Sequence, residues 1–251
     1  MIKKGEKLIL INKWNRFIVV GDLHGDYESY LKTKNFLEKK FSLIYLGDYA
    51  DRGDFGVEII EDLIETTRKY PMKVIALKGN HESYSESGEP NFYPSDLIDE
   101  VNFKKGNWKN YFKEILKPFF DNLPICALHE NFKLFFVHGG ISSKIKSLED
   151  LKKPSKRIEE DLLWSDPIEK EGEFKNPRGA GVLFGKNITS NFCSISKIEK
   201  IIRSHEPRKA LYSPNFEQDG KLITISSTRV YGGRPHILKI ENGRIETIYL
   251  D

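Results

Sequence analysis

The stretch Phe17-Ile18-Val19-Val20-Gly21-Asp22-Leu23-His24-Gly25 decides how this chain folds. It opens with four consecutive apolar residues, three of them β-branched, which predict a buried strand that ends at the first glycine. The pattern returns at residues 43–46 and 74–77, which lead into Gly-Asp and, one residue later, Gly-Asn. Between these strands, residues 27–40 and 57–70 carry apolar side chains at helical spacing. The β-α-β-α-β order predicts a parallel sheet whose ligands gather beyond the carboxyl ends of the strands.

The rest of the chain predicts further strands and helices around this unit. Residues 83–122 are rich in aromatic side chains, and we expect them to form covering helices. Residues 142–160 predict a surface loop and helix, and residues 172–177 an exposed loop. Further strands are predicted at 123–128, 133–137, 198–202, 222–227, 236–241 and 244–249, the last two joined by a hairpin at Asn242-Gly243. We expect one mixed α/β domain over residues 1–251, with two sheets and the helices outside.

Composition excludes several classes of protein. With 40 Lys and Arg against 37 Asp and Glu, the net charge of +3 indicates neither a nucleic-acid-binding nor a membrane-binding surface. The two cysteines, Cys126 and Cys193, are too few for a disulfide framework, so we expect a reducing compartment, the cytoplasm. Residues 1–5 and the short apolar run after them are too short for a signal peptide or a membrane span. Because the last predicted strand ends next to Asp251, we expect no regulatory tail.

Potential metal ligands stand at the ends of the predicted strands, in five clusters that hold four of the six histidines. Carboxylate oxygens and neutral imidazole nitrogens bind divalent metals, and two ions about 3.5 to 4 Å apart can clamp both oxygens of a phosphoryl transfer. Any one cluster could be a turn or a helix cap, but five complementary clusters favour one site. His129 and His236 lie outside the clusters, and we expect them to be structural. The candidate ligands are Asp22, His24, Asp48, Asn80, His138 and His205, with Asp48 bridging the two ions.

Taken together, the clusters resemble the signature of the phosphoprotein phosphatase family, in its bacterial or archaeal form. This family comprises metal-dependent serine/threonine phosphatases of the calcineurin-like metallophosphoesterase superfamily. The resemblance runs from about residue 21 to residue 233 and includes residues 162–167 and Arg178-Gly179. It implies a β-sandwich of mixed sheets flanked by helices, with a dinuclear site at the sheet edge. The family pattern places the first ion on the residues matching Asp22, His24 and Asp48. It places the second on those matching Asp48, Asn80, His138 and His205.

The expected reaction is hydrolysis of a phosphate monoester. Water that bridges two cations is acidic enough to form hydroxide near neutral pH and can attack phosphorus in line. The departing alkoxide needs a proton, and His81 is the candidate acid, with Asp51 orienting its ring by resemblance. Manganese is the ion expected to activate the enzyme in vitro, with iron and zinc as alternatives.

The resemblance also assigns the residues that hold phosphate. Planar guanidinium groups bind phosphate oxygens in pairs, and Arg52 and Arg178 match the family's arginines, with Asn80 as a further phosphate contact. Tyr231 matches a tyrosine on the loop that covers the site. Two positions depart from the pattern. Asp26 replaces a different polar residue, and Gly232 replaces a reactive cysteine, so covalent capture by cysteine-directed toxins is not expected.

These features predict a phosphatase for phosphoserine and phosphothreonine, with phosphotyrosine as a further substrate and phosphorylated proteins as partners. A symmetrical dinucleoside tetraphosphate hydrolase is the alternative enzyme, because it uses similar clusters on the same fold. The intact Asp51-Arg52-Gly53 and the long middle segment favour the protein phosphatase. A non-catalytic scaffold is the third hypothesis, and the intact ligands, acid and arginines oppose it.

Overall fold

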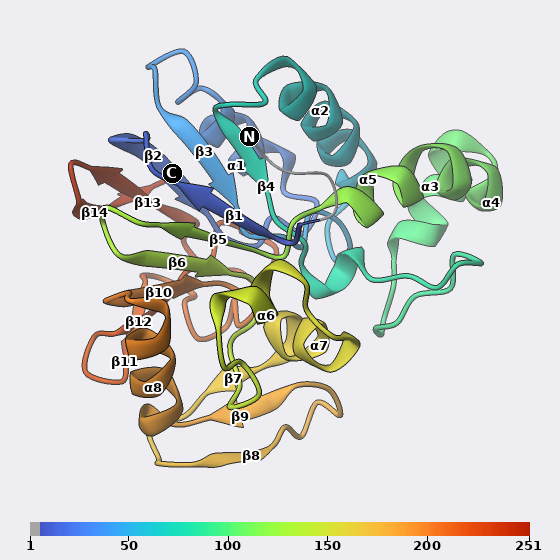
Figure 1. The fold of residues 1–251 in the computed structure, drawn as a ribbon. Helices are drawn as coiled ribbons and strands as arrows, with labels where there is room; N and C mark the ends of the chain where they lie inside the picture. Colours follow the sequence, from blue (N-terminus) through green and yellow to red (C-terminus); the bar gives the residue numbers. More distant parts are fainter. Residues whose placement is uncertain (1–5) are drawn as a thin grey trace.

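The strand at the start of the deciding stretch lies in the middle of a five-stranded sheet. The computed structural model describes residues 6–251 (Figure 1). In it β2 (Arg16–Val20) pairs in parallel with β3 (Ser42–Tyr45), and β3 with β4 (Val74–Ala76). The connections are the helices α1 (Tyr27–Lys34) and α2 (Gly56–Lys69), which confirms the predicted β-α-β-α-β unit. On its other side β2 pairs antiparallel with β13 (His236–Glu241), and β13 with β14 (Arg244–Tyr249).

A second sheet of six strands packs against the first. Its strands, in spatial order, are β1 (Leu8–Ile11), β5 (Cys126–His129), β6 (Leu134–Val137), β10 (Lys200–Arg203), β12 (Leu222–Thr224) and β11 (Asn215–Glu217). Because β10 runs parallel to both of its neighbours, β6 and β12, the carboxyl ends of these three strands share one edge. A third, small sheet consists of β7 (Asp166–Pro167), β9 (Val182–Phe184) and β8 (Glu173–Lys175).

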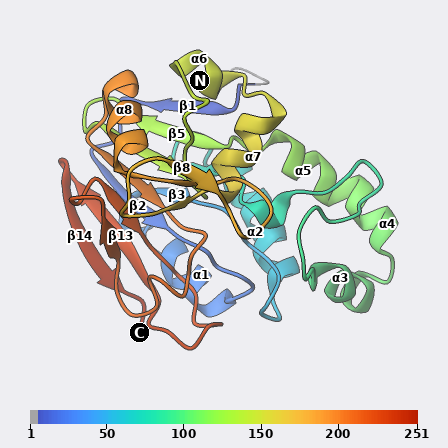
Figure 2. The same ribbon diagram turned by 90° about the horizontal axis from the view of Figure 1, so that it is seen from below.

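Side-chain alternation along β2 explains the layers. Phe17 and Val19 point into a core between the two large sheets, together with apolar residues of β6, β10 and β12. Ile18 and Val20 point to the opposite face, where they pack against apolar residues of α1 and α2. The outer face of the six-stranded sheet is covered by α6 (Leu148–Lys152), α7 (Lys156–Trp164) and α8 (Lys186–Ser196) (Figures 1 and 2). The molecule is therefore a sandwich of sheets with helices on both outer faces.

The covering segment and the C-terminal hairpin also follow the prediction. The covering elements are α3 (Leu97–Lys105), α4 (Trp108–Tyr111), the π-helical turn η2 (Phe112–Leu116) and α5 (Lys117–Asn122). The hairpin between β13 and β14 turns at Asn242 and Gly243, both with φ in the left-handed region, at 51° and 83°.

Several elements differ from the prediction. Helix α1 ends at Lys34 instead of residue 40, because the backbone continues in tighter turns, in which the N–H groups of Phe36, Leu37 and Lys40 each bond to the carbonyl three residues earlier. Residues 172–177, predicted as a loop, contain strand β8, and the third sheet was not expected. Strands β1, β7, β9 and β11 have only two to four residues each, too few for a periodic signal, and helix α8 was also missed. Within residues 6–251, no helix has the length and apolar character needed to cross a bilayer. The expectation for residues 1–5 lies outside the described residues.

Candidate metal centre and cavity

The predicted ligands converge at the carboxyl ends of strands from both large sheets. From the five-stranded sheet, β2, β3 and β4 lead to Asp22 and His24, to Asp48, and to Asn80 at the start of the 3₁₀ turn η1 (Asn80–Glu82). From the six-stranded sheet, β6 and β10 lead to His138 and His205. Three of them, His24, Asp48 and His205, have φ angles of 45°, 54° and 70°, values that non-glycine residues adopt infrequently and that concentrate at functional sites. The backbone therefore adopts the uncommon left-handed conformation at three of the residues that meet in this site.

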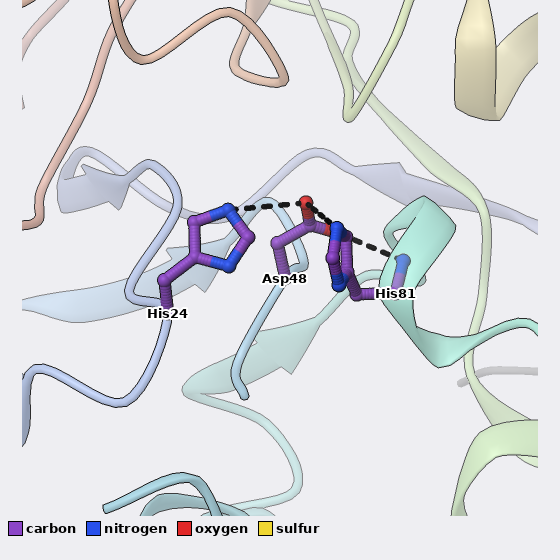
Figure 3. A group of neighbouring side chains, drawn as sticks. All are labelled: His24, Asp48 and His81. Carbon is purple, nitrogen blue, oxygen red and sulfur yellow. Dashed lines mark hydrogen bonds and ion pairs between the residues drawn. The ribbon is translucent and has the colours of Figure 1, made fainter. Parts of the chain in front are cut away.

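His24, Asp48 and His81 form the first group of neighbouring side chains that could hold a metal ion (Figure 3). The Nε2 atom of His24 lies 3.5 Å from Oδ2 of Asp48 and 3.9 Å from Oδ2 of Asp22. The Nδ1 atom of His24 lies 3.0 Å from the carbonyl oxygen of Ala50 and must carry the proton that this carbonyl accepts. The lone pair of Nε2 therefore points toward the carboxylates, as in a histidine that binds metal.

Asp48, His138 and His205 form the second group. Nδ1 of His138 donates to the carbonyl of Leu46 at 3.1 Å, which leaves a lone pair on its Nε2. That nitrogen faces Oδ1 of Asn80 at 2.8 Å and Nδ1 of His205 at 3.2 Å. Since a lone pair of Nε2 meets the amide oxygen at this distance, the contact is repulsive, and a cation bound between the groups would remove the repulsion.

An unpartnered buried atom points to the same conclusion. Oδ2 of Asp22, which lies 3.9 Å from Nε2 of His24, is buried and has no hydrogen-bond partner, although buried polar atoms are ordinarily satisfied. Oxygen and neutral imidazole donors suit divalent ions of the first transition series. The residues therefore fit a pair of divalent metal ions.

The electrostatics of the site also suit cations. Burial, reinforced by the neighbouring His81, lowers the pKa of His24 to about 4. Burial likewise holds the pKa values of His138 and His205 well below the usual value for histidine. The imidazoles are thus neutral at pH 7, as metal binding requires. Burial, followed by the nearby carboxylates of Asp22 and Glu82, raises the pKa of Asp48 well above its usual value. A bound cation would relieve this crowding of buried negative charge.

His81 and Asp51 form a pair beside the ligands. Nδ1 of His81 lies 2.7 Å from Oδ2 of Asp51, while Nε2 lies 3.9 Å from the carboxylate of Asp48. The other oxygen of Asp51 accepts the backbone N–H groups of Asp96 and Leu97, at 2.6 and 2.8 Å. Burial alone would raise the pKa of Asp51, but the hydrogen bond from His81 and these backbone bonds outweigh it, so the pKa is lowered. An ionised Asp51 therefore fixes the ring of His81 with one nitrogen toward the ligands.

A cavity of about 410 Å³ opens over these groups. His24, Asp48, Asn80, His81 and His205 contribute to its wall, together with Arg52, Arg178 and Tyr231. The structure thus brings the expected acid, arginines and tyrosine to one space. The ring of Tyr231 stands edge-on to that of His24, with centroids 5.6 Å apart.

Both arginines are held by carboxylates, which the sequence did not indicate. Arg52 donates to Oδ2 of Asp96 at 3.0 Å and to the carbonyl of Pro94 at 2.9 Å. The Nε atom of Arg178 donates to Oδ2 of Asp166 at 2.8 Å. These contacts fix each guanidinium at the cavity wall and leave its remaining N–H groups to bind a ligand.

Comparison with known proteins gives the family. The model of the calcineurin-like phosphoesterases matches residues 15–209. The chain belongs to the calcineurin-like phosphoesterase family. This confirms, at the level of the family, the resemblance seen in the clusters. In the structure of a serine/threonine phosphatase from Saccharomyces cerevisiae, described as similar to human phosphatase PP5, the calcineurin-like fold recurs with a TM-score of 0.78. That match has 26% sequence identity and covers 97% of this chain and 84% of the yeast chain.

Two curated relatives of this calcineurin-like phosphoesterase are serine/threonine-protein phosphatases by name. C23G10.1 of Caenorhabditis elegans is 33% identical over 224 residues, which are 85% of this chain and 47% of the relative. The PP2A-like PPG1 of Candida albicans is 31% identical over 236 residues, which are 88% of this chain and 55% of the relative. The chain spans about half the length of these curated relatives.

Sequence reasoning gave no role to several residues that hold the calcineurin-like centre together. The carboxylate of Glu82 accepts the backbone N–H groups of Asp48, Tyr49 and Gly79 at 2.8 to 3.0 Å, and burial raises its pKa to about 7. The hydroxyl of Ser204 donates to the carboxylate of Asp22. Both residues adjoin a predicted ligand or acid in sequence, at Asn80-His81-Glu82 and Ser204-His205, and this adjacency was the available signal.

The third such residue, Arg203, is fully buried. It donates to Asp166 at 3.0 Å, to Glu206 at 2.6 Å and to the carbonyl oxygens of Ser165 and Gly139. Because Asp166 also binds Arg178, Arg203 is connected to the cavity wall.

Proposed function

We propose that this chain is a metal-dependent phosphoprotein phosphatase for phosphoserine and phosphothreonine, acting as a single catalytic domain over residues 1–251. The observation that carries the proposal is the pair formed by His81 and Asp51. His81 lines the same cavity as several of the proposed ligands and the two arginines. A hydrolase needs a proton donor for the leaving oxygen, whereas a metal-binding scaffold does not. The names of the curated relatives support the same activity.

The proposed centre holds two divalent cations. Asp22, His24 and Asp48 would bind the first, and Asp48, Asn80, His138 and His205 the second, with manganese as the activating ion in vitro and iron or zinc as alternatives. Bound cations would supply an acidic water and neutralise charge on the phosphoryl oxygens. We assign His81 to proton donation and not to metal binding, because its Nδ1 bonds to the ionised carboxylate of Asp51 and not to a carbonyl oxygen. A carboxylate partner favours the doubly protonated ring, whose Nε2 carries a proton and has no lone pair for a metal.

The protein's own side chains position and protonate the substrate. The free N–H groups of Arg52 and Arg178, with the amide of Asn80, hold the phosphate oxygens. His81 gives the proton on Nε2 to the departing serine or threonine oxygen, while Asp51 stabilises the positive charge of the doubly protonated ring. Tyr231 closes the side of the cavity next to His24.

The proposal includes phosphorylated proteins as partners and the cytoplasm as location. Two cysteines, both buried and unpaired in the structure, are compatible with a reducing compartment. No nucleic-acid or membrane partner is proposed, since the small net charge offers no support for one.

Parallel assays with manganese on a phosphoserine peptide, a phosphotyrosine peptide and diadenosine tetraphosphate test the activity. We expect the phosphoserine peptide to be the best substrate. A preference for the dinucleotide by orders of magnitude would identify the alternative hydrolase, and failure to hydrolyse any of them would favour the scaffold.

The His81→Asn variant tests the role of the acid. It should keep its metal content and lose about 10²- to 10⁴-fold in turnover of phosphoserine. p-Nitrophenyl phosphate provides an internal control, because its leaving group departs without a proton and should be much less affected. Equal losses on both substrates would remove His81 from proton donation.

A further inference from the structure

One cationic side chain of the cavity has no partner among residues 6–251. Four such side chains line the cavity: Arg52 pairs with Asp96, Arg178 with Asp166, and Lys209 with Glu206 and Glu217, which leaves Arg208. Arg208 is exposed, and within residues 6–251 its guanidinium makes no ion pair and no hydrogen bond. Its charge is therefore uncompensated at the cavity wall.

The backbone that carries Arg208 is fixed. Glu206 accepts from the buried Arg203 at 2.6 Å, and its carbonyl accepts the N–H of Lys209 at 2.9 Å. Arg208 lies between these anchors, three residues after His205. A guanidinium on a fixed backbone, facing a cavity and free of internal carboxylates, attracts anions and can bind a carboxylate or phosphate through two N–H groups.

We propose that Arg208 forms a second anion subsite, which selects phosphopeptides with a carboxylate or a second phosphate within a few residues of the phosphorylated residue. The proposal rests on the protein phosphatase activity proposed above. It specifies the class of phosphopeptide that the protein prefers. Arg52 and Arg178 would bind the phosphate itself, whereas Arg208 would bind an acidic group on a neighbouring residue of the peptide.

Paired phosphoserine peptides that differ in one flanking Glu or Ala, at each position from two before to three after the phosphoserine, test the subsite. We expect kcat/KM to be about five- to tenfold higher with Glu at one or more positions, the effect of one partly exposed charge-assisted hydrogen bond. The ratio should fall to about one in Arg208→Gln. Arg244→Gln is the matched control, because Arg244 is exposed on β14 and does not line the cavity, and it should keep the preference.

Two results would overturn the subsite: equal rates on all pairs in the wild type, or a preference that survives Arg208→Gln. Absence of turnover on every peptide would instead overturn the proposed function.

A separate observation concerns the loop of residues 227–233, which carries Tyr231. Asp26 is the N-cap of α1, where its Oδ1 accepts the N–H of Ser29 at 3.1 Å. Its Oδ2 also accepts the backbone N–H of Arg229 at 2.9 Å, and the Arg229 guanidinium donates to Oδ1 at 3.1 Å. The same guanidinium lies 2.9 Å from the carboxylate of Glu28. The loop is thus fastened to the start of α1, two residues after His24.

We infer that Asp26 and Arg229 are positioning residues that hold Tyr231 at the cavity. Tyr231 follows Arg229 by two residues, and its ring stands against that of His24. Without this clamp the loop would remain anchored at Ser227, whose N–H donates to the carbonyl of Asp22 and whose hydroxyl donates to the carbonyl of His236. The part that follows Ser227 would lose its bonds to α1, and the tyrosine would lose its fixed position. The inference rests on the proposed function, in which Tyr231 closes the side of the cavity next to His24.

A double-mutant cycle separates positioning from general stability. Arg229→Gln, and Asp26→Asn, which retains an N-cap side chain, should each lower kcat/KM for a phosphoserine peptide about tenfold, the loss of about one hydrogen bond. In a Tyr231→Ala background, which removes the ring that the clamp holds, the same changes should have little further effect. Arg229→Lys should recover part of the loss.

Multiplicative losses in the Tyr231→Ala background would overturn the inference, as would full activity of Arg229→Gln. An inactive wild type would count against the proposed function and not against the clamp.

Discussion

Replacing Arg203 with methionine should destabilise the protein strongly. Methionine is close to arginine in length and fills the space, but it leaves Asp166 and Glu206 without their shared cation. Removing one partner of a buried ion pair costs about 3 to 5 kcal/mol, because the other charge remains buried. Here Asp166 keeps Arg178 at 2.8 Å and Glu206 keeps Lys209 at 3.0 Å. We therefore expect a loss near the lower end of this range, about 3 kcal/mol in the free energy of unfolding.

Urea unfolding of metal-free protein, followed by circular dichroism, measures this difference. Arg16→Met is the matched control, since Arg16 pairs with Glu241 at 2.6 Å but its side chain is 46% exposed, against 0% for Arg203. An exposed pair contributes about 0 to 1 kcal/mol. If the two variants differ by less than about 1 kcal/mol, the buried ion pairs of Arg203 contribute no more to stability than an exposed pair.

Three further predictions concern acid stability, metal affinity and catalysis. Burial alone would raise the pKa of Asp166, but the guanidinium groups of Arg203 and Arg178 outweigh it and lower the pKa, so the ionised carboxylate adds stability above about pH 4. This stability is lost as the pH falls through the folded-state pKa, and acid unfolding of Arg203→Met should begin at a higher pH. Ser204→Ala removes a hydrogen bond to Asp22 and should weaken manganese binding about 10- to 100-fold in calorimetric titration; unchanged affinity would contradict this role. Asp51→Asn should lower turnover of phosphoserine much more than that of p-nitrophenyl phosphate, and an equal effect would show that Asp51 does not act through the leaving-group proton.

The sequence predicted the parts of the molecule that depend on local pattern. The strands leading to Asp22, Asp48 and His138 are short apolar runs that end at a glycine or directly at a ligand, so both the strand and its chemistry are visible in one stretch. Parallel pairing brings the ends of β2 and β3 together within one sheet, and packing of the second sheet against the first adds the end of β6. The meeting of these ligands can therefore be predicted from the positions of the strand ends in the sequence.

What the sequence did not predict depends on contacts between distant segments. Arg52 meets Asp96 and Arg178 meets Asp166 only after folding, and a single sequence does not indicate such pairs. Glu82 is one residue from His81, yet its three backbone partners come from two different turns. The short strands β1, β7, β9 and β11 exist because neighbours supply their hydrogen bonds, and their own residues have too few alternations to predict them.

The proposed centre takes Asp22 and Asp48 from one large sheet and His138 and His205 from the other. Cations bound there would tie the two sheets together, and they would bind the folded chain but not the unfolded one. At a free metal concentration one hundred times the dissociation constant, one site adds about 2.7 kcal/mol to stability. A cell short of metal would then lose the protein as well as its activity, because the metal-free form unfolds and is degraded more often. The six proposed metal ligands would thus determine both the rate of catalysis and the lifetime of the protein in the cell.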